Sequence, residues 1–226
     1  MVKTKNISDR AYVHIRETLL HSDVYVGQKI LHHELGQKLG ISHTPLREAL
    51  FRLAAEGLLK HENYKGFSVP AITLDEAMDI YEIRELIEPY LARKAAAAMT
   101  GSIFADFSGI LKQYKLYISE PYSRRRLLID KKFHLKIASL AENRTLSSAL
   151  NLVCDKLILK SPIERISSER GKEAIEEHTQ LLKSLGENDG KRAYVLMKSH
   201  INKQKRYMIE HIKLKDSEDL LVPLFA

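Results

Sequence analysis

The stretch from Leu31 to Leu59, LHHELGQKLGISHTPLREALFRLAAEGLL, constrains the fold of this chain more than any other. A short segment of helical periodicity ends at Gly40, a residue type that readily adopts the positive φ found at helix ends. Ser42 is expected to cap a second helix with its side chain, and Pro45 suits that helix's first turn. The apolar residues of the second helix form one stripe: Leu46, Ala49, Leu50 and Leu53. This layout predicts a helix-turn-helix.

The exposed first turn of the second helix carries polar side chains of the kind that reach base edges and phosphates. Arg47 is expected to contact a guanine edge or a phosphate. The candidate DNA contacts in this stretch are His33, Ser42, His43, Thr44, Arg47 and Arg52.

A hairpin is predicted directly after this motif. Two short apolar segments, Leu58–His61 and Phe67–Val69, flank a turn that contains Gly66. Lys65 and Gly66 at its tip are placed to meet phosphate or the minor groove. A lysine at a hairpin tip is usually only solvated, so the DNA role depends on the neighbouring helix-turn-helix. A further short strand at Lys29–Leu31 is expected to pair with the hairpin.

The motif LGISHTPLREAL, followed by EGLL, resembles the DNA-binding signature of the GntR family of bacterial transcription regulators. The resemblance implies a winged helix-turn-helix. The chain departs from the family at His43, where arginine is usual, so base readout at that position is not carried over from relatives.

Composition limits the remaining possibilities. A chain of 226 residues suits one large or two modest domains, and its net charge of +7 permits nucleic-acid binding without proving it. A single cysteine, Cys154, excludes an intramolecular disulfide and fits a reducing cytoplasm. No apolar run reaches the ~20 residues that span a bilayer, so no membrane role is expected.

The domain boundary is predicted near residue 72. Thr73 to Glu76 forms a capping box, with threonine as the cap and glutamate three residues later. We therefore expect a DNA-binding domain at 1–72 and an all-helical domain at 73–226, which makes the protein mainly α. The six expected helices of the second domain are 74–99, 103–118, 122–141, 145–160, 171–186 and 190–213. Pro89 lies inside the first and is expected to kink it.

Four polar residues lie on apolar helix faces of this bundle. Asp130 and His134 are one turn apart on one helix, and His178 and His200 lie on two others. Burying them without partners is costly, and a shared divalent transition metal such as Zn²⁺, Ni²⁺ or Mn²⁺ would partner all four. The alternative is that each is a hydrogen-bonded core residue. His211 is a rival to His200 because it lies three turns further on the same face.

The motifs DKKFH at 130–134, EH at 177–178 and HI at 200–201 resemble the pattern of the FCD domain, the ligand-binding domain of FadR-like GntR regulators. Asn143 and the segment from Ile83 to Glu88 also match. The resemblance implies that Asp130, His134, His178 and His200 are metal ligands. It also implies that the site binds small organic acids. Six helices rather than seven would favour the VanR-like subgroup.

Arg84 lies on a buried stripe of the first bundle helix and needs an anion there. One interpretation is a bidentate clamp for an effector carboxylate; the other is a salt bridge to Glu88 or to a glutamate of another helix. The sequence does not decide between these two interpretations of Arg84.

The sequence predicts a metabolite-responsive transcription regulator, most simply a repressor, that binds a palindromic DNA operator as a homodimer. A metal-dependent enzyme with an appended DNA-binding module is the main alternative. The absence of an obvious general base argues against it, because Glu177 lies 100° off the ligand face. A regulator with a purely structural metal site is the third possibility.

Overall fold

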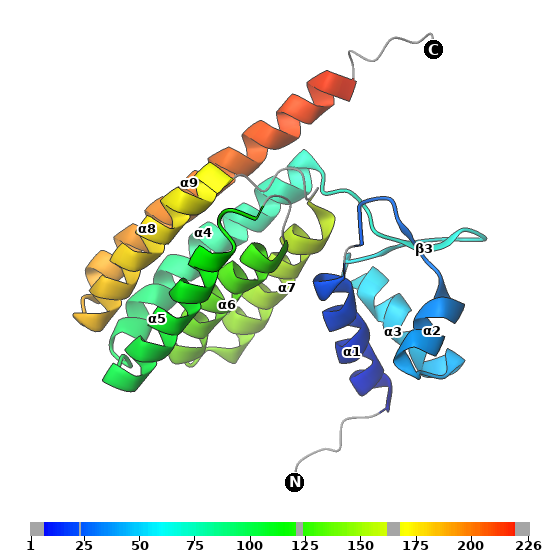
Figure 1. The fold of residues 1–226 in the computed structure, drawn as a ribbon, viewed down its shortest axis with the longest axis horizontal. Coiled ribbons are helices and arrows are strands. Elements are labelled where there is room, and N and C mark those ends of the chain that lie inside the picture. Colours follow the sequence, from blue (N-terminus) through cyan, green and yellow to red (C-terminus); the bar gives the residue numbers. More distant parts are fainter. Residues whose placement is uncertain (1–6, 23, 121–123, 162–167, 220–226) are drawn as a thin grey trace. The chain divides into compact units, whose positions relative to one another are not determined.

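A computed structural model describes residues 7–22, 24–120, 124–161 and 168–219 of the chain. These residues are mainly helical (Figure 1). Their elements are, in chain order, α1 (Ile7–His21), β1 (Lys29–Ile30), α2 (His32–Leu39), α3 (His43–Ala55), β2 (Lys60–Glu62), β3 (Gly66–Ser68), α4 (Leu74–Ala96), α5 (Gly101–Leu116), α6 (Arg124–Leu140), α7 (Arg144–Lys160), α8 (Ser168–Gly186) and α9 (Gly190–Asp219).

The chain divides into two compact units after Ile72, and the end of α7 from Asp155 groups with the first unit. The predicted helix start at 122 and 123 lies outside the described residues.

The first unit contains the expected helix-turn-helix. Gly40 ends α2 with a φ of 63°, and the predicted stripe of α3 is buried. The expectation for the Ser42 side chain is wrong. Ser42 occupies the N-cap position of α3, but its side chain makes no capping hydrogen bond. Ser42 is exposed, so water can satisfy the first amides of the helix in its place.

The predicted hairpin is present, and β1 joins it to form a three-stranded antiparallel sheet in the order β1-β3-β2. Phe67 of β3 pairs with Ile30 on one side and His61 on the other. Tyr64 and Gly66 form the turn with φ values of 65° and 81°. The ring of Phe67 also lies 5.1 Å from that of Phe51 in α3, which packs the hairpin against this helix.

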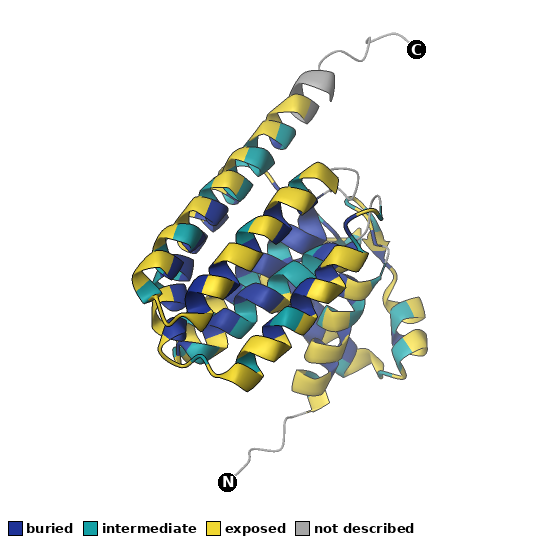
Figure 2. Cartoon of the chain, turned by 60° about the vertical axis from the view of Figure 1, so that its left-hand side comes forward, coloured by how far each residue is buried: buried dark blue, intermediate teal, exposed yellow. Residues whose placement is uncertain are grey.

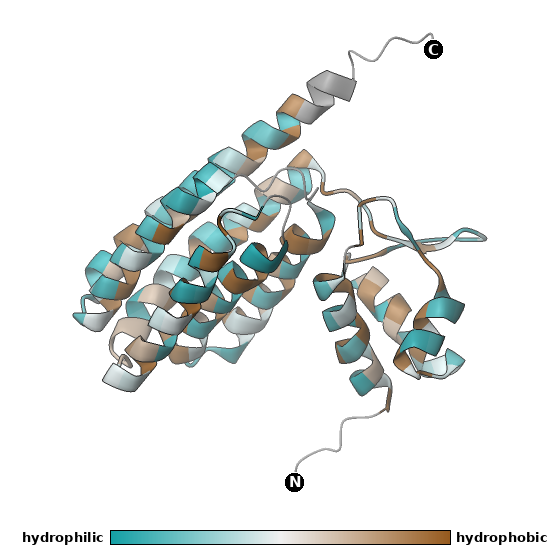
Figure 3. Ribbon diagram, in the orientation of Figure 1, coloured by the Kyte–Doolittle hydropathy of each residue, from teal (hydrophilic) through white to brown (hydrophobic). Residues whose placement is uncertain are grey.

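The second unit is a bundle of α4, α5, α6, α8, α9 and the part of α7 up to Cys154. Its buried residues are mainly apolar, and Figures 2 and 3 colour the ribbon by burial and by hydropathy. Thr73 caps α4 by accepting a hydrogen bond from the Glu76 amide at 3.2 Å, as the capping box predicts. Helix α9 packs along α4 and α8, and α6 packs against α4 and α5. This arrangement brings the inner faces of α4, α6, α8 and α9 together.

The six predicted bundle helices are confirmed, with ends that differ by a few residues. Helix α4 ends at Ala96 rather than 99, and Pro89 is buried inside it. Helix α9 continues to Asp219 rather than 213. Among the described residues, no helix is long and apolar enough to cross a membrane.

Candidate metal centre and DNA-binding surface

The structure brings the four predicted metal ligands together. Asp130 and His134 come from α6, His178 from α8 and His200 from α9, and one ligand atom of each lies within 4.8 Å of the others. Nε2 of His178 is 3.2 Å from Nε2 of His200 and 3.5 Å from a carboxylate oxygen of Asp130. Nε2 of His134 is 3.7 Å from the other oxygen of Asp130. Three imidazole nitrogens and one carboxylate therefore converge.

The chemistry of these donors fits a metal ion. Burial lowers the pKa of His178 well below its usual value, and the neighbouring His200 and His134 lower it further. Burial likewise lowers the pKa of His200, although Glu177 opposes this shift. Neutral imidazole is the form that ligates metals. Nε2 of His134 is buried and makes no hydrogen bond. A three-nitrogen, one-oxygen donor set suits borderline divalent transition metals, so the cluster could hold such an ion.

Glu88 of α4 binds Nδ1 of His134, the ring nitrogen that does not face the other three residues of the cluster. Its carboxylate pairs with Nδ1 of His134 and accepts a hydrogen bond of 2.5 Å from Nε of Arg84. Glu88 is 1% exposed and Arg84 3% exposed. Burial alone would raise the pKa of Glu88, but Arg84 and His134 outweigh burial and lower it to about 2. The Glu88 carboxylate is therefore ionised in the folded protein.

Glu177 of α8 plays the same part for a second ligand. It accepts hydrogen bonds from Nδ1 of His200 at 2.6 Å, from Arg170 at 2.7 Å and from Lys203 at 2.9 Å. Burial raises its pKa, but the hydrogen bonds from His200 and Arg170 outweigh burial and lower it. Glu177 lies off the ligand face of its own helix, as expected, yet its side chain reaches a histidine of the next helix.

Sequence reasoning did not assign Glu88 or Glu177 to the centre. The signal for Glu88 was present, because a glutamate four residues after Arg84 on a buried stripe needs cationic partners. For Glu177 the signal was its place directly before His178, together with Arg170 two turns before it and a histidine on the next helix. Neither pattern reveals a contact between helices.

The two interpretations of Arg84 can be compared with its observed contacts. The salt bridge to Glu88 is in place, and Nη1 of Arg84 also donates to the side-chain oxygen of Gln204 at 3.0 Å. Contact between Arg84 and an effector remains a prediction. His211, the rival ligand, bonds through Nδ1 to the Tyr207 carbonyl at 2.8 Å and is not part of the cluster.

The predicted DNA contacts lie in the first unit, and most are exposed. His33, Ser42, His43, Thr44, Arg47 and Lys65 are exposed, and Gly66 is half-buried. The Arg47 guanidinium lies 5.5 Å from the ring centre of Phe51, at the start of the recognition helix α3. Lys65 is within 3.7 Å of Glu62 at the hairpin tip.

Arg52 differs from the other candidate contacts because partners in its own unit already bind it. It pairs with Asp9 at 3.1 Å and Glu56 at 3.3 Å, and it lies over the ring of Tyr12 at 3.9 Å. A phosphate contact by Arg52 would have to compete with these interactions.

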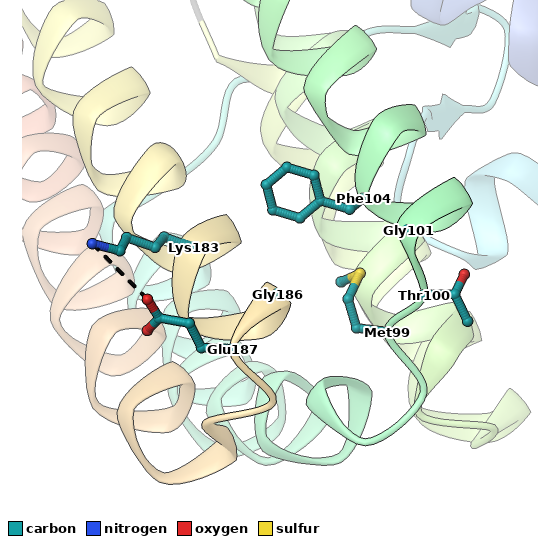
Figure 4. A pocket seen from close by; sticks show the side chains of 7 residues that line it. All are labelled: Met99, Thr100, Gly101, Phe104, Lys183, Gly186 and Glu187. Carbon is teal, nitrogen blue, oxygen red and sulfur yellow. Dashed lines mark ion pairs between the residues drawn. The ribbon is translucent and has the colours of Figure 1, made fainter.

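A separate pocket of about 390 Å³ lies where α8 ends and α5 begins (Figure 4). None of the four clustered ligands lines it. Phe104 packs against Gly186 there, and Lys183 pairs with Glu187 at 3.9 Å. Its lining residues are Met99, Thr100, Gly101, Phe104, Lys183, Gly186 and Glu187.

A winged helix-turn-helix followed by a helical domain with a buried donor cluster is the architecture of a ligand-responsive DNA-binding regulator. Comparison with known proteins gives the family. Residues 7–69 match the gntR family of bacterial regulatory proteins, and residues 79–203 match the FCD domain. The chain therefore belongs to the GntR family of transcription regulators, in the FadR-like branch that carries an FCD domain.

Individual relatives agree with this assignment. The Nta operon transcriptional regulator of Aminobacter aminovorans is 30% identical over 190 residues, covering 83% of this chain and 87% of that protein. The transcriptional repressor RspR of Escherichia coli is 25% identical over 139 residues, covering 62% and 61%.

The solved structure of E. coli McbR/YncC has the same fold. It matches with a TM-score of 0.79 at 18% identity, covering 91% of this chain and 98% of that one. The two curated relatives are named as a transcriptional regulator and a transcriptional repressor, so the enzyme alternative finds no support among them.

Proposed function

We propose that this protein is a metabolite-responsive repressor whose helical domain binds a divalent transition metal and a small organic acid. The observation that carries this proposal is the convergence of one ligand atom from each of three histidines and one aspartate within 4.8 Å, with all three histidines buried. Asp130, His134, His178 and His200 would hold the ion, with Zn²⁺, Ni²⁺ or Mn²⁺ as candidates. The bound ion would supply positive charge to attract a carboxylate of the effector.

The output of this regulator is sequence-specific DNA binding. Two copies would place their α3 helices in successive major grooves of a palindromic operator, in the cytoplasm. Arg47, Thr44 and His43 at the exposed start of α3 would face the groove, while Lys65 and Gly66 would meet the backbone or the minor groove. Ser42, Arg52 and His33 are the further candidate contacts.

Regulation requires that the effector binds one arrangement of the two domains more tightly than another. Coupling free energies of this kind are typically ~1–3 kcal/mol, which corresponds to roughly 5- to 150-fold in DNA affinity. Repression is the simplest mode of regulation for such a protein, which would release its operator when the acid binds.

Gel-shift titration against DNA from the gene's own promoter region tests the regulator function. We expect sequence-selective binding that is lost in Arg47→Ala but kept in the control Lys191→Ala, which changes an exposed lysine of α9. Absence of selective binding by the wild-type protein would refute a regulatory role at that promoter.

The metal and effector parts are tested on the same protein. Elemental analysis after purification without chelator should find about one ion per chain. A panel of small carboxylic acids should then change the operator affinity of the metal-loaded protein. If the ion is present but no acid changes either DNA affinity or melting temperature, the metal would be structural.

A further inference from the structure

Two of the three clustered imidazoles are each held by a glutamate that is itself bound by an arginine. Arg84 donates to Glu88, whose carboxylate pairs with Nδ1 of His134. On the other side of the cluster, Arg170 donates to Glu177, which accepts from Nδ1 of His200. The two Arg–Glu–His chains use different helices, α4 with α6 and α8 with α9.

The carboxylates determine which ring nitrogen faces the cluster. An ionised carboxylate only accepts hydrogen bonds, so the histidine nitrogen bound to it must carry the proton. In a neutral imidazole the lone pair is then on Nε2, the nitrogen that points to the other ligands. The direction of each ring is fixed at the same time, because Nδ1 is held at one end.

We propose that Glu88 and Glu177 are positioning residues of the metal centre, each fixing one imidazole with Nε2 toward the ion, and that Arg84 and Arg170 hold these carboxylates. The inference rests on the proposed metal site. It assigns Arg84 a role that acts through Glu88 rather than as a direct effector clamp.

The third imidazole provides an internal comparison. Nδ1 of His178 is buried and makes no hydrogen bond. Its ring lies 4.4 Å from that of Phe133 and 5.7 Å from that of Tyr114. A histidine at this place is therefore buried without a carboxylate on Nδ1, so burial alone does not explain the glutamates beside His134 and His200.

Four variants test the proposal by calorimetric titration with Zn²⁺ and Ni²⁺. Glu88→Gln and Glu177→Gln should each weaken binding by roughly 10- to 100-fold, the usual effect of losing an outer partner of a metal-bound histidine. Glu85→Gln and Glu176→Gln, on the same two helices, should bind like the wild type. Glu85 pairs with Lys205, and Glu176 is exposed.

A second measurement separates positioning from a merely structural role. Nitrogen NMR of the imidazoles in metal-free protein should show His134 and His200 protonated at Nδ1. In each glutamine variant, the corresponding histidine should lose this preference, and the other should keep it. The Glu88 change leaves Arg84 buried without its anion and can unfold the bundle, so Glu177→Gln, which is 13% exposed, is the safer variant.

The outcomes distinguish the two proposals. Wild-type affinity in both glutamine variants would overturn the positioning role while leaving the metal site intact. An affinity loss with unchanged tautomers, matched by a lower melting temperature of metal-free protein, would also overturn it. Failure of the wild type itself to bind either ion would remove the metal site and this inference with it.

Discussion

Gln204 contacts a ligand atom of the proposed metal centre. Its side-chain nitrogen donates to Nε2 of His200 at 2.8 Å, while its oxygen accepts from Arg84 at 3.0 Å. Because arginine has only donors, the Arg84 contact fixes which end of the amide faces His200. The amide therefore uses the same lone pair of His200 that a metal ion would require.

This competition predicts that Gln204→Leu tightens metal binding. A neutral hydrogen bond contributes ~0.5–1.5 kcal/mol, so its removal should lower the dissociation constant for Zn²⁺ by roughly 2- to 10-fold. The measurement is competition against a chelating dye. Gln180→Leu on α8, an exposed position, is the control and should change nothing. Weaker binding in Gln204→Leu would instead make Gln204 a supporting residue.

Cys154 is expected to be inert in the folded protein. It is 5% exposed, and burial raises the pKa of its thiol to about 12. The thiolate is the reactive form, so at pH 8 the folded protein should not react with an aromatic disulfide reagent. Denaturant should release one reactive thiol per chain. Ser148→Cys, at an exposed site of the same helix, should react at once without denaturant.

The four clustered residues could be predicted from sequence because each is a polar side chain on an otherwise apolar helix face. The glutamates that bind these histidines could not be predicted in the same way. Glu88 and Glu177 contact histidines 46 and 23 residues away in the chain, and such contacts depend on helix packing rather than on periodicity. The periodicity of a single helix shows which way a side chain points but not which helix lies opposite.

Two helix starts offer a direct comparison of side-chain capping. Thr73 accepts a hydrogen bond from the Glu76 amide, whereas Ser42 makes no such bond. Thr73→Ala should therefore lower the free energy of unfolding by ~1 kcal/mol. Ser42→Ala should lower it by much less, although both residues occupy N-cap positions. Denaturant titration of the two variants measures the difference, and equal losses would contradict it.

The periodicity of the sequence predicted where the helices lie more reliably than where they end. Helix α9 was expected to end near residue 213, but no glycine or proline occurs between Gly190 and Pro223, and the helix continues to Asp219. The Ser42 cap was mispredicted because residue type shows a preference for a position, not whether the side chain makes the bond. The two-residue strand β1 could be suggested only through its expected pairing with the hairpin.

At the scale of the whole molecule, metal binding should stabilise the helical unit selectively. An ion that binds only the folded state adds ~2.7 kcal/mol at a free concentration of 100 times the dissociation constant. Zn²⁺ should therefore raise the melting temperature of the bundle, and a chelator should reverse the shift. Asp130→Ala should abolish the gain. A shift of the same size in that variant would place the ion elsewhere.

The capping box at Thr73 predicts a domain boundary near residue 72, since a new helix start after a short linker often marks a new domain. The structure divides the chain after Ile72 but also groups the end of α7 with the first unit. Sequence periodicity could not foresee that division, because α7 is one uninterrupted helix from Arg144 to Lys160.

The donor cluster also joins distant points of the polypeptide. His134 lies on α6, whereas His178 and His200 lie on the hairpin of α8 and α9, with the whole of α7 between them. An ion shared by these side chains would act as a reversible cross-link that closes a long loop. Loop-closure entropy grows only slowly with loop length, so this long-range link needs little more free energy than a short one. The α8–α9 hairpin could then separate from α6 only if bonds to the ion broke. The packed bundle would therefore persist longer when the centre holds an ion.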